Sequence, residues 1–244
     1  MYAVHEEIAQ IPAVTCEEIQ AVIDRGDIPV VWQPIVSLTT RDVLGYEALA
    51  RFSATDDLSP AAWFKAATKY GLRQELEILA VRSAVAQLGR LPETVFVSLN
   101  VSPGTVASSE LAEVLDGVAA SRIVLEISED AVVDASEPVQ ASIDRLRSSG
   151  VRVALDDTGS GLVSLRQLLG VHADIIKIDT DVTRGIDFDP TKQAIAYALK
   201  SLAERSGAMS LAEGVETEEE AELLTSLGIG AAQGYLFGKP SAIA

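Results

Sequence analysis

The sequence predicts an α/β protein, a (β/α)8 barrel of the TIM type, on three observations. Its 244 residues match the size of one such barrel. Short β-branched runs alternate with longer segments of helical periodicity, which favours a mainly parallel sheet. There are eight such runs, the number that closes this barrel. An open doubly wound sheet is the alternative, but its nucleotide-binding turns, Gly-x-Gly-x-x-Gly and Gly-x-x-x-x-Gly-Lys, are absent from the sequence.

The eight predicted strands are short apolar runs bounded by turn residues. They lie near residues 29–36, 43–49, 95–100, 123–128, 151–156, 174–179, 208–213 and 231–236.

The segments between and before them have the 3.6-residue periodicity of amphipathic helices, several opened by Ser, Asp or Thr caps. They lie near residues 15–25, 60–88, 106–119, 137–148, 161–169, 190–206 and 217–227. Thr217 and Glu220 have the spacing of a capping box.

Composition and charge limit the class of protein. Hydrophobic residues make up 48% of the chain and charged residues 23%, which is typical of a globular domain. No apolar run is long enough for a membrane span, and the first residues lack the basic start of a signal peptide, so we expect a cytoplasmic protein without a membrane partner. Residues 1–14 are expected to form a tail and residues 15–244 a single domain without an attached sensor domain.

The charge and the scarcity of soft ligands also restrict what the chain binds. The net charge of −17 disfavours polymeric nucleic acid, which needs a basic surface. With Cys16, His5 and His172 as the only cysteine and histidines, a structural zinc site is not expected. Any metal ion would therefore be held mainly by oxygen.

Polar residues recur at the same place in strand after strand, within or at the end of an apolar run. They are Gln33, Glu47, Asn100, Glu126, Asp156, Lys177, Glu213 and Gln233. A buried carboxylate costs several kcal/mol unless it is compensated, and a single one is often a structural ion pair. Eight polar residues at equivalent positions instead predict a site at the C-terminal mouth of the barrel, where such barrels place their chemistry.

Several carboxylates that converge in one mouth would repel one another. Hard divalent cations such as Mg²⁺ or Mn²⁺ would relieve this repulsion, because they prefer oxygen ligands. Two such ions can activate water and stabilise the reacting oxygens of a phosphodiester, with Lys177 as an additional positive charge and Glu213 as a candidate general base. The residues alone therefore predict a divalent metal site, of a kind that could cleave a phosphodiester.

An ordered series of short motifs resembles the EAL-domain family of bacterial cyclic di-GMP phosphodiesterases, from about residue 20 onward. The series is Gln33-Pro34-Ile35-Val36, Glu47-Ala48-Leu49-Ala50-Arg51, Asn100-Val101-Ser102, Glu126-Ile127-Ser128-Glu129, Asp156-Asp157, Lys177-Ile178-Asp179, Glu213-Gly214-Val215-Glu216 and Gln233-Gly234-Tyr235. Each motif is weak by itself, but the whole set in order is specific.

The resemblance implies a barrel whose first strand is antiparallel to the rest, cyclic di-GMP as ligand, two ions of Mg²⁺ or Mn²⁺, linear pGpG as product, and a homodimer. It also implies roles for individual residues. The implied metal ligands are Glu47, Asn100, Glu126 and Asp156, with Asp157 at the second ion and Asp179 in the same neighbourhood. Lys177 and Glu213 would orient or activate the water, beside Gln233. Gln33 and Arg51 would contact the dinucleotide, and Glu129 would anchor the loop after Asp157.

This loop departs from the family pattern. Active members commonly have Asp-Asp-Phe-Gly-x-Gly-Tyr-Ser-Ser, whereas this chain has Thr158, Leu162 and Val163 at the Phe, Tyr and first Ser positions. The departure leaves a second hypothesis open, a receptor that binds cyclic di-GMP without cleaving it. A third, another Mg²⁺-dependent barrel enzyme, leaves the ordered motifs unexplained.

Overall fold

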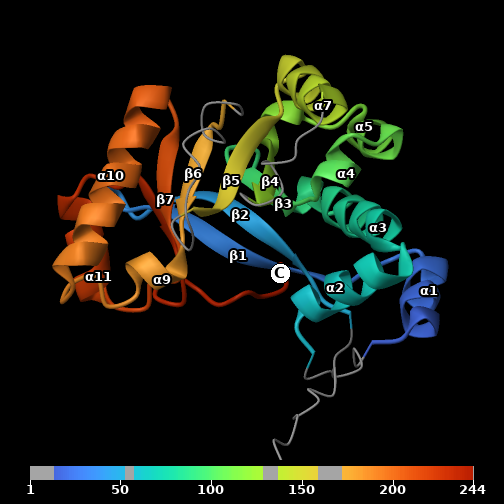
Figure 1. Ribbon diagram of the computed structural model, residues 1–244, viewed down its shortest axis with the longest axis horizontal. Coiled ribbons are helices and arrows are strands. Elements are labelled where there is room, and N and C mark those ends of the chain that lie inside the picture. The colour runs from blue at the N-terminus through green and yellow to red at the C-terminus, as the bar shows by residue number, and fades with distance from the viewer. Residues whose placement is uncertain (1–13, 53–57, 129–136, 159–171, 244) are drawn as a thin grey trace, which may run out of the picture.

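A computed structural model of the chain describes residues 14–52, 58–128, 137–158 and 172–243. Its eight strands form one closed barrel in the order β1-β2-β3-β4-β5-β6-β7-β8. Figure 1 shows the strands at the centre, with α10 and α11 on one side and α1 to α5 and α7 on the other. The predicted barrel is confirmed, and the open doubly wound sheet is excluded.

The strands lie close to their predicted positions. Their bounds are β1 Val30–Ser37, β2 Val43–Ala50, β3 Phe96–Asn100, β4 Ile123–Ser128, β5 Arg152–Thr158, β6 Ile175–Ile178, β7 Met209–Ala212 and β8 Ala231–Gln233.

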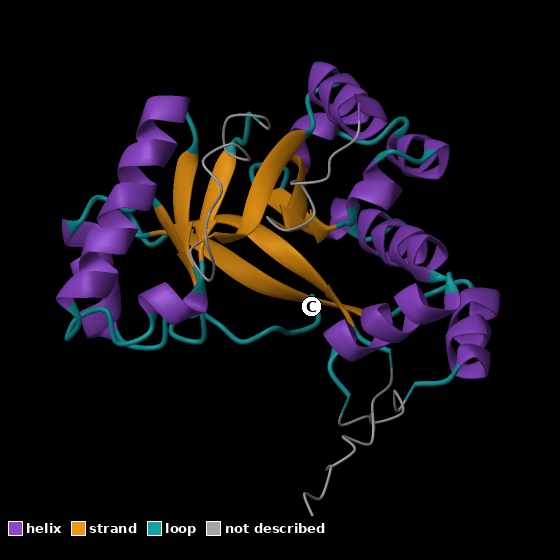
Figure 2. Ribbon diagram, in the orientation of Figure 1, coloured by secondary structure: helices purple, strands orange, loops and turns teal. Residues whose placement is uncertain are grey.

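The helices cover the outside of the barrel (Figure 2). Their bounds are α1 Cys16–Arg25, α2 Pro60–Tyr70, α3 Arg73–Val85, α4 Pro103–Val106, α5 Ser109–Leu115, α7 Glu137–Ser148, α9 Thr180–Thr183, α10 Pro190–Ser206 and α11 Glu218–Ser226, with 3-10 turns at Leu88–Arg90 and Ala120–Arg122.

Two predicted helices differ from the structure. The segment 60–88 is interrupted at Gly71, whose φ of 73° ends α2, and the chain then restarts as α3. The segment 106–119 is instead the short helices α4 and α5, because Ser108 caps a new helix by accepting a hydrogen bond from the Leu111 amide. The predicted helix 161–169 lies outside the described residues. The capping box of Thr217 and Glu220 at the start of α11 is confirmed.

The first strand runs against its two neighbours. β1 is antiparallel to β2 and to β8, whereas every other neighbouring pair in the barrel is parallel. A short turn from Leu38 to Asp42 joins β1 to β2 at the N-terminal end of the parallel strands, closed by the Ser37 amide donating to the Asp42 carbonyl at 2.9 Å. The expectation of an antiparallel first strand is therefore confirmed.

The side chains inside the barrel form layers, as the two-residue period of a strand requires. The lower interior is an apolar cluster to which seven strands contribute a buried residue. Its members are Ile35, Phe96, Val124, Ala154, Ile175, Leu211 and Ala231, with Leu44 and Met209 packed against them. Larger apolar clusters fill the space between strands and helices. The residue two positions further toward the mouth on each of these strands points into the same interior, and these residues are polar.

None of the helices in the described residues has both the length and the apolarity that crossing a membrane requires.

Candidate active site

The polar residues predicted from the strands form one layer above the apolar interior. Neighbouring strands bring them into register: Gln33 is paired with Glu47, and Asn100 is paired with Glu126. Glu126 follows Val124 by two residues, and Lys177 follows Ile175 in the same way. The apolar residue packs the barrel and the polar residue above it faces the mouth.

The centre of this layer is the ammonium group of Lys177, whose side chain is 2% exposed. Its Nζ lies 2.7 Å from Glu126 Oε2, 2.7 Å from Glu213 Oε1 and 3.0 Å from Asp156 Oδ1. These three carboxylates come from β4, from the residue after β7, and from β5. One buried cation thus joins three strands that are distant in the sequence.

A second group, built around Glu47, completes the layer. Asn100 Nδ2 donates to Glu47 Oε1 at 2.7 Å, and Gln233 Nε2 donates to Glu47 Oε2 at 2.6 Å. Gln233 Nε2 also lies 2.9 Å from Gln33 Oε1, and Gln33 Nε2 donates to the Gly238 carbonyl at 3.2 Å. Both oxygens of Glu47 are therefore held by amides from different strands.

The site carries more negative than positive charge. Four carboxylates, those of Glu47, Glu126, Asp156 and Glu213, act on the single cation Lys177. Burial alone would lower the pKa of Lys177, but these carboxylates raise it well above its ordinary value. Lys177 is therefore a permanent positive charge at neutral pH.

The pKa values of two carboxyl groups in the site are also raised, which favours their neutral form. Burial raises the pKa of Glu126 well above its usual range, which the Lys177 ammonium opposes and the neighbouring carboxylates reinforce. The pKa of Glu213 is raised to about 7, first because burial disfavours its charge and then because Asp156 and Glu47 repel it, while Lys177 acts against both. A single ammonium therefore does not neutralise the cluster, and a further cation or bound protons must do so.

The donor set fits a hard divalent cation. It consists of carboxylate and amide oxygens. In the part of the chain that the structure describes, Gln233 Oε1 is buried without a hydrogen-bond donor, and Asp156 Oδ1 is buried with only the Lys177 ammonium beside it. Among the same residues, no three acidic, histidine or cysteine side chains converge closely enough to enclose an ion. Since the carboxylates turn toward Lys177, an ion would require them to rotate outward, toward the mouth.

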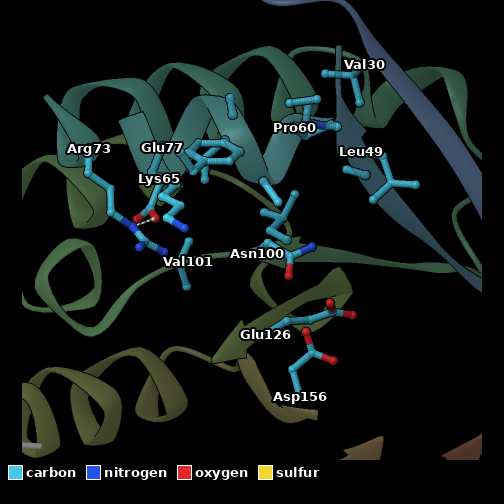
Figure 3. Close-up of a pocket in the computed structure, with 18 of the residues that line it drawn as sticks. Val30, Leu49, Pro60, Lys65, Arg73, Glu77, Asn100, Val101, Glu126 and Asp156 are labelled. Carbon is cyan, nitrogen blue, oxygen red and sulfur yellow. Dashed lines mark hydrogen bonds and ion pairs between the residues drawn. The ribbon is translucent and has the colours of Figure 1, made fainter. Parts of the chain in front are cut away.

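Two cavities reach the polar layer. One, of about 620 Å³, lies against α2 and α3 and is lined by Asn100, Glu126 and Asp156 on its polar side. Figure 3 shows Glu126 and Asp156 close together, with Asn100 above them and the apolar wall beyond. The other, of about 300 Å³, is lined by Glu47 and Glu213 and by Arg184. Both acidic groups of the layer are thus accessible to a ligand.

Two residues expected from the resemblance, Arg51 and Asp179, stand apart from this layer. The Arg51 guanidinium donates to the Ala50 carbonyl at 2.9 Å and is half-buried beside the mouth. Asp179 caps α9, accepting from the Asp181 amide at 2.6 Å. The side chain of Asp157 and the whole of Glu129 lie outside the described residues, as does most of the altered loop.

Sequence reasoning missed Ser98, whose hydroxyl donates to Glu126 Oε1. Ser98 is buried and stands next to Glu47 in the register of β2 and β3. The signal was present, because Ser98 precedes Asn100 by two residues and so shares its face of the strand.

The fold and the site together define a class: (β/α)8 barrels with an acidic, lysine-centred site in the C-terminal mouth. Residues 17–240 match the family model described as "EAL domain". The chain belongs to the EAL domain family.

Known relatives agree with this assignment. The chain is 31% identical over 91% of its length to "Probable cyclic di-GMP phosphodiesterase PdeI" of Escherichia coli, and 30% identical over 96% of its length to "Cyclic di-GMP phosphodiesterase RocR" of Pseudomonas aeruginosa. Among solved structures it resembles a calcium and cyclic di-GMP complex of Klebsiella pneumoniae BlrP1, with a TM-score of 0.79, 31% identity and coverage of 88% of this chain and 56% of the other. A manganese complex of BlrP1 matches equally well.

The chain spans only part of these relatives. It covers 30% of PdeI and 62% of RocR. An EAL domain protein of Listeria monocytogenes is of similar extent, with a TM-score of 0.80, 25% identity and 94% coverage of both chains.

Proposed function

We propose that this chain hydrolyses cyclic di-GMP to linear pGpG with the help of two Mg²⁺ or Mn²⁺ ions. The observation that carries the proposal is the cluster of carboxylates around Lys177 in the mouth of an EAL barrel. The names of PdeI and RocR support the substrate, and the manganese and calcium complexes of BlrP1 support a divalent metal.

The metal ligands in this proposal are oxygen donors of the layer and its edge. They are Glu47, Asn100, Glu126, Asp156, Asp157 and Asp179. The chemistry that the ions supply is polarisation of the phosphoryl group and activation of water.

Lys177 and Glu213 have complementary roles in the reaction. Lys177 keeps its charge, because the carboxylates hold its pKa high, and it offsets the negative charge of the phosphate. Glu213, with a pKa of about 7, takes the proton of the attacking water. The water oxygen forms a bond to phosphorus, the bond from phosphorus to the 3′ oxygen breaks, and a proton ends on that oxygen, so one water is added.

The neutral side of the layer binds the dinucleotide in this proposal. Gln33 and Gln233 present amides next to Glu47 and line the smaller cavity. Arg51, at the end of β2, supplies a cation for a phosphate. Glu129 would anchor the loop that follows Asp157.

The test follows the product directly. Purified protein is incubated with cyclic di-GMP and Mn²⁺ or Mg²⁺, and pGpG is measured by chromatography. We expect turnover by the wild type and a loss of about 100-fold or more in Glu47→Gln, because this change removes a charged oxygen ligand at nearly constant shape. Glu75→Gln, on the exposed face of α3, is the matched control and should retain wild-type activity.

Two results would contradict the proposal. Tight binding of cyclic di-GMP without pGpG would favour the receptor, to which the altered loop from Thr158 to Val163 points. Cleavage of unrelated phosphodiesters without preference for the cyclic dinucleotide would favour a different barrel enzyme.

We further propose that the chain acts as a homodimer in the cytoplasm. Support for the dimer comes from exposed apolar side chains before and within α10: Phe188 is 87% exposed and Tyr197 is 57% exposed. A second copy of this chain would cover them.

A further inference from the structure

Glu77 is a buried glutamate on α3. It lies outside the polar layer formed by the strand residues, but it accepts hydrogen bonds from the segment that follows β3. Its side chain is 3% exposed. Its Oε2 accepts three hydrogen bonds, from the Ser102 amide at 2.9 Å, the Ser102 hydroxyl at 2.7 Å and the Thr105 hydroxyl at 2.6 Å. Its Oε1 accepts from Arg73 Nε at 2.6 Å, the contact drawn as a dashed line in Figure 3.

This arrangement exceeds what packing of α3 requires. A carboxylate on the buried face of a helix costs several kcal/mol unless charge-assisted hydrogen bonds compensate it, and an apolar residue would pack there without that cost. Ser102 occupies the N-cap position of α4, yet its hydroxyl makes no capping bond and is donated to Glu77 instead. The Ser102 hydroxyl therefore links the turn after β3 to Glu77 of α3 and does not cap α4.

The turn that Glu77 holds begins at Asn100. Only Val101 separates Asn100 from Ser102, and the Val101 amide donates to the Glu126 carbonyl at 3.0 Å. Asn100 Nδ2 donates to Glu47, and within the described part of the chain nothing donates a hydrogen bond to the Asn100 amide oxygen. Glu77 therefore holds one end of a short segment, at Ser102, and Glu47 holds the other end, the side chain of Asn100, which carries this oxygen.

We propose that Glu77 is a positioning residue for Asn100: it fixes the first turn after β3 so that the Asn100 oxygen is directed toward a divalent cation. This inference rests on the proposed function, because it takes Asn100 as a metal ligand. Groups that orient ligands in this way commonly raise metal affinity by about 10- to 100-fold.

The experiment measures Mn²⁺ binding without substrate, by the electron paramagnetic resonance signal of free Mn²⁺. We expect Glu77→Gln to weaken binding about tenfold, because the amide can no longer accept all four bonds. The control is Asp174→Asn. Asp174 also accepts from a backbone amide, that of Val153 at 2.9 Å, and pairs with an arginine, Arg147, but it precedes β6 at the other end of the barrel. This variant should lose stability and keep its Mn²⁺ affinity.

A double-mutant comparison separates positioning from general damage. If Glu77 acts through Asn100, Glu77→Gln should add nothing to the loss of Mn²⁺ affinity already caused by Asn100→Ala. Ser102→Ala removes one donor and keeps the rest, and it replaces Glu77→Gln in both measurements if that variant does not fold; we expect it to weaken binding about threefold.

The outcomes are distinguishable. Wild-type affinity in Glu77→Gln, or additive losses with Asn100→Ala, would overturn the positioning role while leaving the proposed function intact. Absence of Mn²⁺ binding by the wild type would instead overturn the metal site on which both proposals depend.

Discussion

At the scale of single residues, the site is a balance of charge around Lys177. The ammonium is buried where an isolated charge would not be stable, and it is stable only because three carboxylates contact it. Burial raises the pKa of Glu213 to about 7, and repulsion from Asp156 and Glu47 adds to this effect while Lys177 opposes it. The burial that makes Glu213 a candidate base near neutral pH therefore also makes its negative charge unfavourable for the stability of the fold.

This balance predicts how the stability of the metal-free protein depends on pH. The pKa of Glu213 is about 7 in the folded state and near 4.5 when unfolded. The folded protein therefore binds more protons in this range, and stability falls as the pH rises from about 4.5 to 7. Each unit contributes about 1.4 kcal/mol, so Glu213→Gln, which keeps the shape without the charge, should gain about 2 kcal/mol relative to wild type between pH 5.5 and 8.

Thermal unfolding in EDTA checks this prediction. The difference between the melting temperatures of the two proteins should grow by roughly 4–8 °C between pH 5.5 and pH 8. The exposed control Glu75→Gln should follow the wild type throughout. A constant difference between Glu213→Gln and wild type at all pH values would show that Glu213 does not titrate in this range.

At the scale of elements, the layer depends on how closely the strand ends approach one another. Beyond β8 the chain folds over the segment after β7: the Val215 amide donates to the Gln233 carbonyl at 3.1 Å, and the Leu236 amide donates to the Val215 carbonyl at 3.1 Å. Gly234 lies between these bonds, and a Cβ there would overlap the Val215 backbone. Its lack of a side chain lets Glu213 and Gln233 face the same space.

Gly234→Ala should therefore separate the two segments. We expect a loss of about 3 kcal/mol or more in unfolding free energy, together with a loss of pGpG formation, because the obstacle is backbone and not a movable side chain. Urea denaturation and the chromatographic assay measure the two effects. Gly89→Ala, where no heavy atom lies within 4 Å of the added Cβ, should be close to neutral. Equal effects of the two substitutions would contradict the close-approach explanation.

Much of this element level follows from sequence pattern. The eight strands and the ring of polar residues were predictable because strand burial has a fixed two-residue period, and Glu126 or Lys177 inside an apolar run breaks it visibly. The alternation of buried and exposed residues is the same for either direction of a strand, so it did not predict that β1 is antiparallel to its neighbours. The signal for this direction was the short connection from Leu38 to Asp42, because a parallel crossover needs a dozen or more residues.

Other features could not be read from the pattern. The interruption at Gly71 was missed because a glycine inside a long helical segment can be tolerated, and only its positive φ shows that α2 ends there. Glu77 resembles any helix glutamate next to an arginine at i−4, and only the fold places Ser102 beside it. The roles of Asp157, Glu129 and the altered loop stay predictions.

At the scale of the whole molecule, the helical coat is uneven in its exposed apolar groups. Phe188, which precedes α10, and Tyr197, in the middle of that helix, are exposed. The helix α10 lies on the side of the molecule away from α2 in Figure 1. With a net charge of −17, two copies would repel each other unless apolar contacts of this kind outweigh the repulsion.

We expect the wild type to be a dimer by light scattering and Phe188→Ser to dissociate about 30-fold more readily, since a central aromatic residue commonly contributes 2 kcal/mol or more to an interface. Tyr70→Ser, at the end of α2, changes an exposed aromatic residue elsewhere and should leave the mass unchanged. A monomeric wild type, or equal behaviour of the two variants, would refute the role of this surface.

The reversed first strand also determines which end of the barrel the chain reaches when it enters β1. Because β1 runs downward from the mouth, the segment that joins α1 to it arrives beside the site, where the Arg51 amide donates to the Pro29 carbonyl at 2.8 Å. In an all-parallel barrel the same segment would arrive at the far end, a full strand length from the chemistry. Here only a few residues separate the end of α1 at Arg25 from Gln33 in the polar layer.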